Sequence, residues 1–268
     1  MSVTVRQFWG TFIITAILIL FVAAAGAQGL TVDMLLARIA TGPDTQPYSM
    51  TAEFTSRLTL TGPTGTFVIP GTGSMVEARA NGEQRRRKIT LTTLQVPLLL
   101  RPFTNGLRDA VRELIEADNR AVEFLGTQDV FVGDEAASGR YALGGVRTDI
   151  VTEVMTRYGQ TGMLRDPTAR RAIAKWLHAP SQRASIVRGG TGPYILSAVV
   201  DETGVIHDLT LFYDWGQVRN HVTYMTVGGR PFWRDFNTDT SRQVAGIGRV
   251  DANLVVNFAN HCLNCQTR

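Results

Sequence analysis

The 268-residue chain has only two cysteines, Cys262 and Cys265, and both lie within its last seven residues. No cysteine follows the apolar N-terminal run, which argues against lipid attachment there. The chain also lacks the Gly-x-Ser-x-Gly elbow, the His-Glu-x-x-His pair, the P-loop and the Gly-x-Gly-x-x-Gly loop. Because no nucleophile–base pattern is visible, we expect a protein without catalytic residues, cofactor or metal ion.

Charge is sparse and balanced. The chain is 44% hydrophobic and 19% charged, with a formal net charge of +4, which is typical of a folded protein. The dense basic run is Arg85-Arg86-Arg87-Lys88. Alternate residues of a strand face opposite ways, so we interpret the run as a solvated or edge strand, with contact to anionic lipid as the alternative. No interleaved aromatic patch accompanies it, so nucleic acid is not an expected partner.

The N-terminus is typical of an exported protein. Arg6 precedes an almost wholly apolar run, Phe8 to Ala25, and Ala25-Gly26-Ala27 matches the small-x-small pattern that signal peptidase cleaves. We expect a signal peptide over residues 1–27 and a periplasmic or extracellular protein. The alternative is an uncleaved membrane anchor, because the run approaches the length of a membrane-spanning helix. No low-complexity linker follows, so residues 28–268 are expected to form a single domain.

Long strands flank the middle of the chain. From Ser49 to Thr61 apolar and polar residues alternate, which predicts a long strand with one dry face. Asn81-Gly82 is the strongest hairpin signal and joins the strands on either side of it. Gly126 to Gly145 is harder to interpret and contains one expected strand. The last third predicts strands over 183–188, 194–201, 205–213, 217–227 and 243–251.

Helical patterns occupy four segments. A short N-terminal helix is expected over 31–40, and three amphipathic helices are expected over 105–119, over 148–158 and from Pro167 onward. The order of strands, helices and strands excludes a parallel strand–helix alternation. We therefore predict an α+β fold: one highly curved antiparallel sheet, a half-barrel, whose concave side is closed by the mid-chain helices as a lid.

This pattern resembles a known group of folds. The chain combines a short N-terminal helix, a long first strand from Tyr48 to Phe54, and the strand–acidic turn–strand segment from Val200 to Tyr213. In this it resembles the LolA/LolB superfamily of periplasmic lipoprotein carriers, which includes mycobacterial lipid-carrier lipoproteins and the RseB N-terminal domain. The resemblance implies a fold that holds acyl chains. The basic-proline-aromatic stretch of the lipoprotein chaperones does not follow Gly82, and the resemblance assigns no functional residue.

Two local motifs remain. Cys262-Leu-Asn-Cys265, after His261, is interpreted as a small disulfide loop in an oxidising compartment, with a thioredoxin-type pair or a zinc site as alternatives. His207 and His221 lie on neighbouring expected strands, where surface histidines are the ordinary case and a paired metal site is the alternative. Gly228-Gly229 and Pro231 are expected to break a strand and leave Phe232, Trp233 and Phe236 on a loop at the mouth of the cup or at a membrane.

The resulting hypothesis is a non-enzymatic carrier or sensor that binds a lipid or an acylated protein between sheet and lid. The ligand-lining candidates come from periodicity and from the aromatic loop: Phe54, Leu58, Phe67, Val111, Leu114, Val154, Trp176, Phe232 and Trp233. Ordinary core packing explains the same pattern. The alternatives are an envelope interaction module without ligand, and an exported hydrolase or thiol protein.

Overall fold

The computed structural model describes residues 31–42, 46–80, 86–116, 121–137, 139–178, 192–244 and 248–265. The expected signal peptide, the Asn81-Gly82 turn and the strand expected over 183–188 lie outside these residues. The strands are β1 (Tyr48–Gly62), β2 (Gly65–Arg79), β3 (Arg86–Leu94), β4 (Gln128–Ala137), β5 (Arg140–Arg147), β6 (Ile195–Asp201), β7 (Ile206–Tyr213), β8 (Gly216–Val227), β9 (Arg230–Val244) and β10 (Gly248–Leu263).

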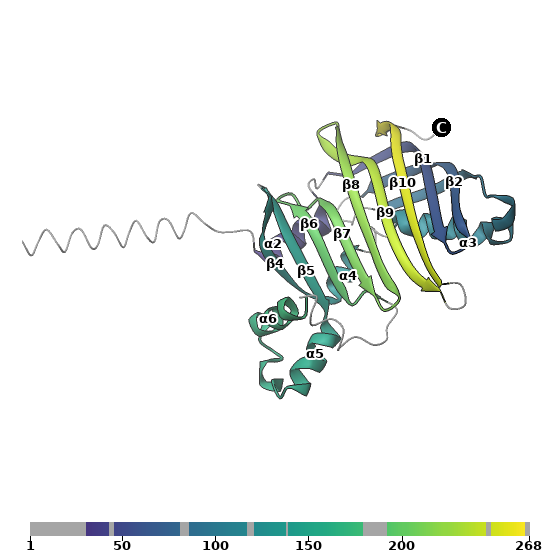
Figure 1. Ribbon diagram of the computed structural model, residues 1–268. Helices are drawn as coiled ribbons and strands as arrows, with labels where there is room; N and C mark the ends of the chain where they lie inside the picture. Colours follow the sequence, from purple (N-terminus) through teal and green to yellow (C-terminus); the bar gives the residue numbers. More distant parts are fainter. Residues whose placement is uncertain are drawn as a thin grey trace, which may run out of the picture.

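All ten strands form one curved, unclosed antiparallel sheet, which confirms the predicted fold class (Figure 1). Their order is β3-β2-β1-β10-β9-β8-β7-β6-β5-β4, so the first strand lies beside the last. The edge strands are β3 and β4. Because β4 follows β3 in sequence, the chain must cross from one edge of the sheet to the other between them.

The described helices come from three parts of the sequence: the segment before β1, the crossing from β3 to β4, and the connection from β5 to β6. They are α2 (Val32–Thr41), α3 (Thr104–Glu116), α4 (Ala121–Gly126), α5 (Thr148–Arg157) and α6 (Pro167–His178), with short 3-10 turns η1 (Leu98–Phe103) and η3 (Thr161–Met163). The periodicity predicted α2, α3, α5 and the start of α6 to within a few residues. Thr31 caps α2 by accepting a hydrogen bond from the Met34 main chain.

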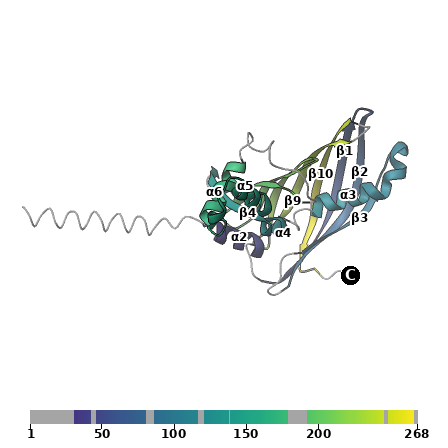
Figure 2. The same cartoon turned by 90° about the horizontal axis from the view of Figure 1, so that it is seen from below.

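One face of the sheet, here called the inner face, is continuous from edge to edge. Strand register places Leu211 opposite Val218, and Leu254 opposite Leu58, and all four side chains lie on it. Helix α3 packs on this face at the β3 end, while α2 and α4 pack on it at the β4 end (Figure 2). The polar residues between the apolar positions of β1, such as Glu53 and Thr55, face the opposite, outer side.

Helices α5 and α6 lie on the outer face. They pack with Phe131, Val146 and Ile195. The adjacent residues Val130 and Leu196 point to the inner face and belong to the core cluster that α2 and α4 cover. The prediction that all three mid-chain helices close the inner side is therefore wrong for two of them. The physical reason is that β4–β6 are apolar on both faces, as the four consecutive buried residues 143–146 show, so each face requires a cover.

Candidate functional site

An elongated cavity of about 390 Å³ lies between the inner face and the crossing helices. Its floor comes from β1 and from β7 to β10, with Leu58, Leu211 and Ala252 among the floor residues. Its roof comes from Leu107, Ala110 and Leu114 of α3, and from Phe124 of α4. The lining is mostly apolar, and the volume lies in the range of small-molecule sites in proteins.

Two aromatic rings line the cavity where β7 turns into β8. Trp215 stacks on Tyr213, with ring centroids 4.8 Å apart, and the Arg242 guanidinium lies 5.4 Å from the centre of the Trp215 ring. Glu113 of α3 also lines the cavity. Trp215, Arg242 and Glu113 are exposed. The site thus combines an apolar interior with a rim of one cation, one anion and two aromatic rings.

Only part of the predicted lining set comes together here. Leu58 and Leu114 line the cavity. Phe54 and Val111 belong to the same core cluster but are buried in its filled part, where the Phe54 ring covers Gly73 so closely that a Cβ there would lie 2.4 Å from it. Phe67 is half-buried near the start of β2, opposite Leu60. Sequence periodicity found the strand positions but missed the residues from β7 to β10.

Val154 and Trp176 lie elsewhere. Both line a separate groove between α5 and α6, on the outer face of the sheet. A helix pattern shows which residues share a face, but it does not show which side of the sheet that face meets. Phe54 and Val154 therefore line no common space in this fold.

The aromatic loop expected at Phe232 and Trp233 is not a loop. Both residues are 1% exposed and lie on β9, and Phe236 is equally buried. Gly228 and Gly229, both with positive φ, form a two-residue turn in which Val227 pairs with Arg230. Consecutive positive-φ residues match the twist of a hairpin, so the glycines join two strands rather than ending one. The expectation of an exposed mouth or membrane loop here is wrong.

A buried polar network fills the other end of the inner face. Arg87 donates from Nη2 to Glu77 Oε2 at 2.6 Å, and the Tyr48 hydroxyl donates to Glu77 Oε1 at 2.6 Å. The Arg87 guanidinium also lies 3.4 Å from the centre of the Trp233 ring. The side chains of Arg87 and Glu77 are 1% and 2% exposed. The described part of the basic run, residues 86–88, thus lies on an edge strand as expected, but Arg87 points into the core.

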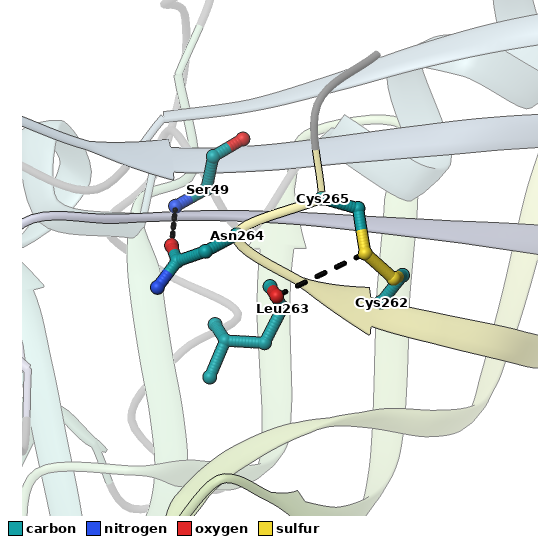
Figure 3. Close-up of a disulfide and its surroundings, with 5 residues drawn as sticks. All are labelled: Ser49, Cys262, Leu263, Asn264 and Cys265. Carbon is teal, nitrogen blue, oxygen red and sulfur yellow. Dashed lines mark hydrogen bonds between the residues drawn. A yellow bond between two sulfur atoms is a disulfide. The ribbon is translucent and has the colours of Figure 1, made fainter. Parts of the chain in front are cut away.

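The chain end is held against β1. The structure joins Cys262 and Cys265 in a disulfide, and Asn264 and Ser49 exchange hydrogen bonds beside it (Figure 3). Asn264 has a positive φ of 55°, which bends the chain between the two cysteines. His261 donates from Nε2 to the main-chain oxygen of Trp233 at 2.7 Å. This histidine is therefore oriented by the sheet rather than by the sulfur atoms.

His207 and His221 each bond to a carboxylate. His207 lies 3.2 Å from Asp201, and His221 lies 2.6 Å from Asp208, so the two rings do not share a site. Among the described residues, no group of three or more His, Cys, Asp and Glu is placed to hold a metal ion. In the same part of the chain, no helix is long and apolar enough to span a membrane.

The β6–β7 turn carries an anchored carboxylate. Asp201 accepts hydrogen bonds from the Thr203 main chain and hydroxyl, from the Val205 main chain and from His207. Burial alone would raise the pKa of Asp201, but these hydrogen bonds together outweigh it and hold the pKa below its usual value. The turn is packed against α2, since a Cβ at Gly204 would lie 2.5 Å from the Arg38 main chain.

No protein-family model matches the chain, and no curated protein matches it in sequence. The similar solved structures include a DUF1329 family protein from Desulfovibrio piger, at 10% identity and a TM-score of 0.42, over 87% of this chain and 92% of that one. They also include a putative outer membrane lipoprotein-sorting protein domain from Vibrio parahaemolyticus, at 8% identity and 0.38, over 90% and 94%. A lipovitellin structure is similar at 5% identity and 0.31, over 84% and 26%.

A putative lipoprotein-sorting domain is thus among the similar solved structures. At identities of 10% or less and TM-scores below 0.5, these likenesses carry no argument about what the chain binds. The functional argument rests on the cavity.

Proposed function

We propose that the chain is an exported, non-enzymatic carrier or sensor that binds the acyl chain of a lipid or acylated protein in the inner-face cavity. The observation that carries this proposal is the apolar space of about 390 Å³ left between the sheet and α3. Protein interiors are normally packed without voids of this size. An apolar ligand that leaves water gains about 0.8 kcal/mol per CH₂ group, which favours filling such a space with an acyl chain.

The rim supports an amphipathic ligand. Arg242, which lies beside Trp215, and Glu113 of α3 are both exposed and line the cavity. A ligand whose chain lies over Leu58 and Ala252 would leave its polar group near these two charges. The signal-peptide pattern of residues 1–27 supports a location outside the cytoplasm, in the periplasm or beyond the cell, and a Cys262–Cys265 disulfide fits that oxidising location.

The first test is native mass spectrometry of the protein purified from its own envelope, followed by solvent extraction. We expect a co-purifying lipid or acylated peptide that is lost on denaturation. A second measurement is uptake of a fluorescent fatty acid by the emptied protein. A clean mass together with no uptake would contradict the proposal and would favour an envelope interaction module without ligand.

A pair of variants assigns the binding to this cavity. Ala110 is exposed on α3 and lines the cavity, so Ala110→Trp should fill it without disturbing the core. Arg112 is exposed on the same helix and lies outside the lining, which makes Arg112→Trp the matched control. We expect Ala110→Trp to weaken fatty-acid binding at least tenfold, a change of about 1.4 kcal/mol, and Arg112→Trp to leave it unchanged.

A further inference from the structure

The groove between α5 and α6 is a second apolar surface, independent of the inner-face cavity. It encloses about 560 Å³ and is lined by Val154, Met155 and Ile173 in its depth. Helix α6 meets the sheet through Ala174 and Leu177, so the groove lies on the side of the helix pair that faces away from the sheet. Within the described part of the chain, nothing covers it.

Large exposed side chains border the groove. Tyr158, Met163 and Trp176 line it and are 64%, 44% and 43% exposed. Tyrosine and tryptophan are the residues enriched at the boundary between water and lipid, because each joins an apolar ring to a polar group. An apolar helical face with such a border is also the pattern of proteins that lie on a membrane surface.

The charge around the groove has a small positive excess, because most of its arginines are paired with carboxylates. From Arg157 to His178 the sequence has five basic residues and one acid, Asp166. The first turns of α5 add Asp149 and Glu153, and each of these pairs with an arginine. Arg165 and Lys175 are exposed, and within the described residues no ion pair involves either of them. Unpaired cations beside an apolar groove complement anionic lipid head groups.

Helix α6, which borders the groove, is also joined to α2, the first helix of the described chain. Asp33, in the first turn of α2, pairs with Arg171 of α6 at 3.1 Å. Only residues 26–31 separate α2 from the apolar run Phe8–Ala25. If that run is retained as a membrane anchor, the α5–α6 pair is tethered near the same membrane.

We propose that the α5–α6 groove docks on a membrane surface that contains anionic lipids. The apolar border of Tyr158, Met163 and Trp176 enters the interface, and Arg165 and Lys175 lie among the head groups. The face is on the opposite side of the sheet from the cavity, so docking leaves the inner-face site unblocked. This proposal does not depend on the ligand of that site.

The test is hydrogen–deuterium exchange of the full chain with vesicles of phosphatidylcholine alone or of phosphatidylcholine and phosphatidylglycerol. The readout is local to residues 148–178, so any contact of residues 1–30 with lipid does not enter it. We expect exchange in α5 and α6 to slow at least about fivefold with the anionic vesicles only. In Arg165→Gln/Lys175→Gln, the anionic lipid needed for half-maximal protection should rise roughly 25-fold, at about fivefold for each charge removed.

Control variants distinguish membrane contact of the α5–α6 groove from contact of η1, which is also apolar and exposed in the described chain. Leu98 and Leu99 of η1 are 73% and 77% exposed, and Leu98→Ser/Leu99→Ser should leave the protection of α5 and α6 unchanged. Trp176→Ser, at an exposed position, should reduce it. Three outcomes would overturn the proposal. Both vesicle types could protect α5 and α6 equally, or η1 could be protected in their place. Another envelope protein could also protect α5 and α6 where vesicles do not.

Discussion

At the scale of single residues, the basic run shows how a strand directs neighbouring side chains to opposite faces of the sheet. Arg86 and Lys88 are exposed, whereas Arg87 between them is 4% exposed and pairs with Glu77 directly across the β2–β3 ladder. The sequence predicted that the four side chains could not share a face. It could not show that the inward arginine had a partner, because Glu77 is ten residues away on another strand.

Removing the cation from this pair should be costly. In Arg87→Met the Glu77 carboxylate stays buried without its guanidinium, so we expect the free energy of unfolding to fall by about 3–5 kcal/mol. In Arg86→Met, one position away and exposed, the change should stay within about 0.5 kcal/mol. Urea denaturation of both variants measures the difference. Equal losses would show that the pair does not stabilise the fold.

Asp201 makes stability depend on pH. Its pKa is lowered in the folded state, so its contribution is present above the pKa of the unfolded chain and is lost as the pH falls below about 4. At pH 7 we expect Asp201→Asn to lower the free energy of unfolding by about 1–2 kcal/mol, through weaker hydrogen bonds at the turn. The gap between variant and parent should shrink in acid. A gap that is constant from pH 7 to pH 3 would contradict this account.

At the scale of elements, glycine turns set where one strand ends and the next begins. Gly204 lies between β6 and β7 with a φ of 89°, and Gly229 lies between β8 and β9 with a φ of 81°. A Cβ at Gly204 would meet the α2 main chain, whereas a Cβ at Gly229 would meet nothing within 4 Å. The two glycines therefore share a backbone requirement and differ in packing.

This contrast gives a matched pair of substitutions. Gly229→Ala should cost about 1–2 kcal/mol for the left-handed backbone alone. Gly204→Ala should cost about 1–3 kcal/mol more, because the turn must move away from α2. Thermal unfolding of both variants tests the docking of α2 on the turn. Equal losses would indicate that α2 adjusts freely.

Elements with a strict period were predictable, and those without one were not. The alternation from Ser49 to Thr61 predicted β1 almost in full. The strand expected over 243–251 is wrong, since β9 ends at Val244 and β10 begins at Gly248. Two strands, β4 and β5, run through 126–145, where one was expected, because β5 is buried on both faces and its glycines interrupt the pattern. The strand propensity of single residues does not identify strands of this kind.

At the scale of the whole molecule, the cavity depends on the chain crossing from β3 to β4. Its lining combines β1, the crossing helices and β7 to β10, so residues up to about 190 positions apart meet in it. The sequence predicted Leu58 and Leu114 as lining residues because each faces inward within its own element. It could not predict Val218 or Arg242, whose place follows from the strand order.

If the cavity binds an acyl chain, the ligand should stabilise the whole domain. A fatty acid at 100 times its dissociation constant adds about 2.7 kcal/mol to the free energy of unfolding. For a domain of this size we expect Tm to rise by about 5–10 °C. Ala110→Trp should lose that rise and Arg112→Trp should keep it. Calorimetric scans with and without the fatty acid provide the measurement, and equal rises in the two variants would place the ligand elsewhere.

The seam between β1 and β10 has a consequence for biosynthesis. It pairs residues such as Leu58 and Leu254, near opposite ends of the chain, in the middle of the sheet. Contacts between distant residues form late because the intervening chain must first be closed into a loop. A nascent chain emerging from the ribosome or from a translocation channel therefore presents β1 with β2 on one side and an open edge on the other until the last strand arrives. Any product that stops before Gly248 keeps that edge, and it would be a substrate for proteases and for aggregation rather than a smaller version of the protein.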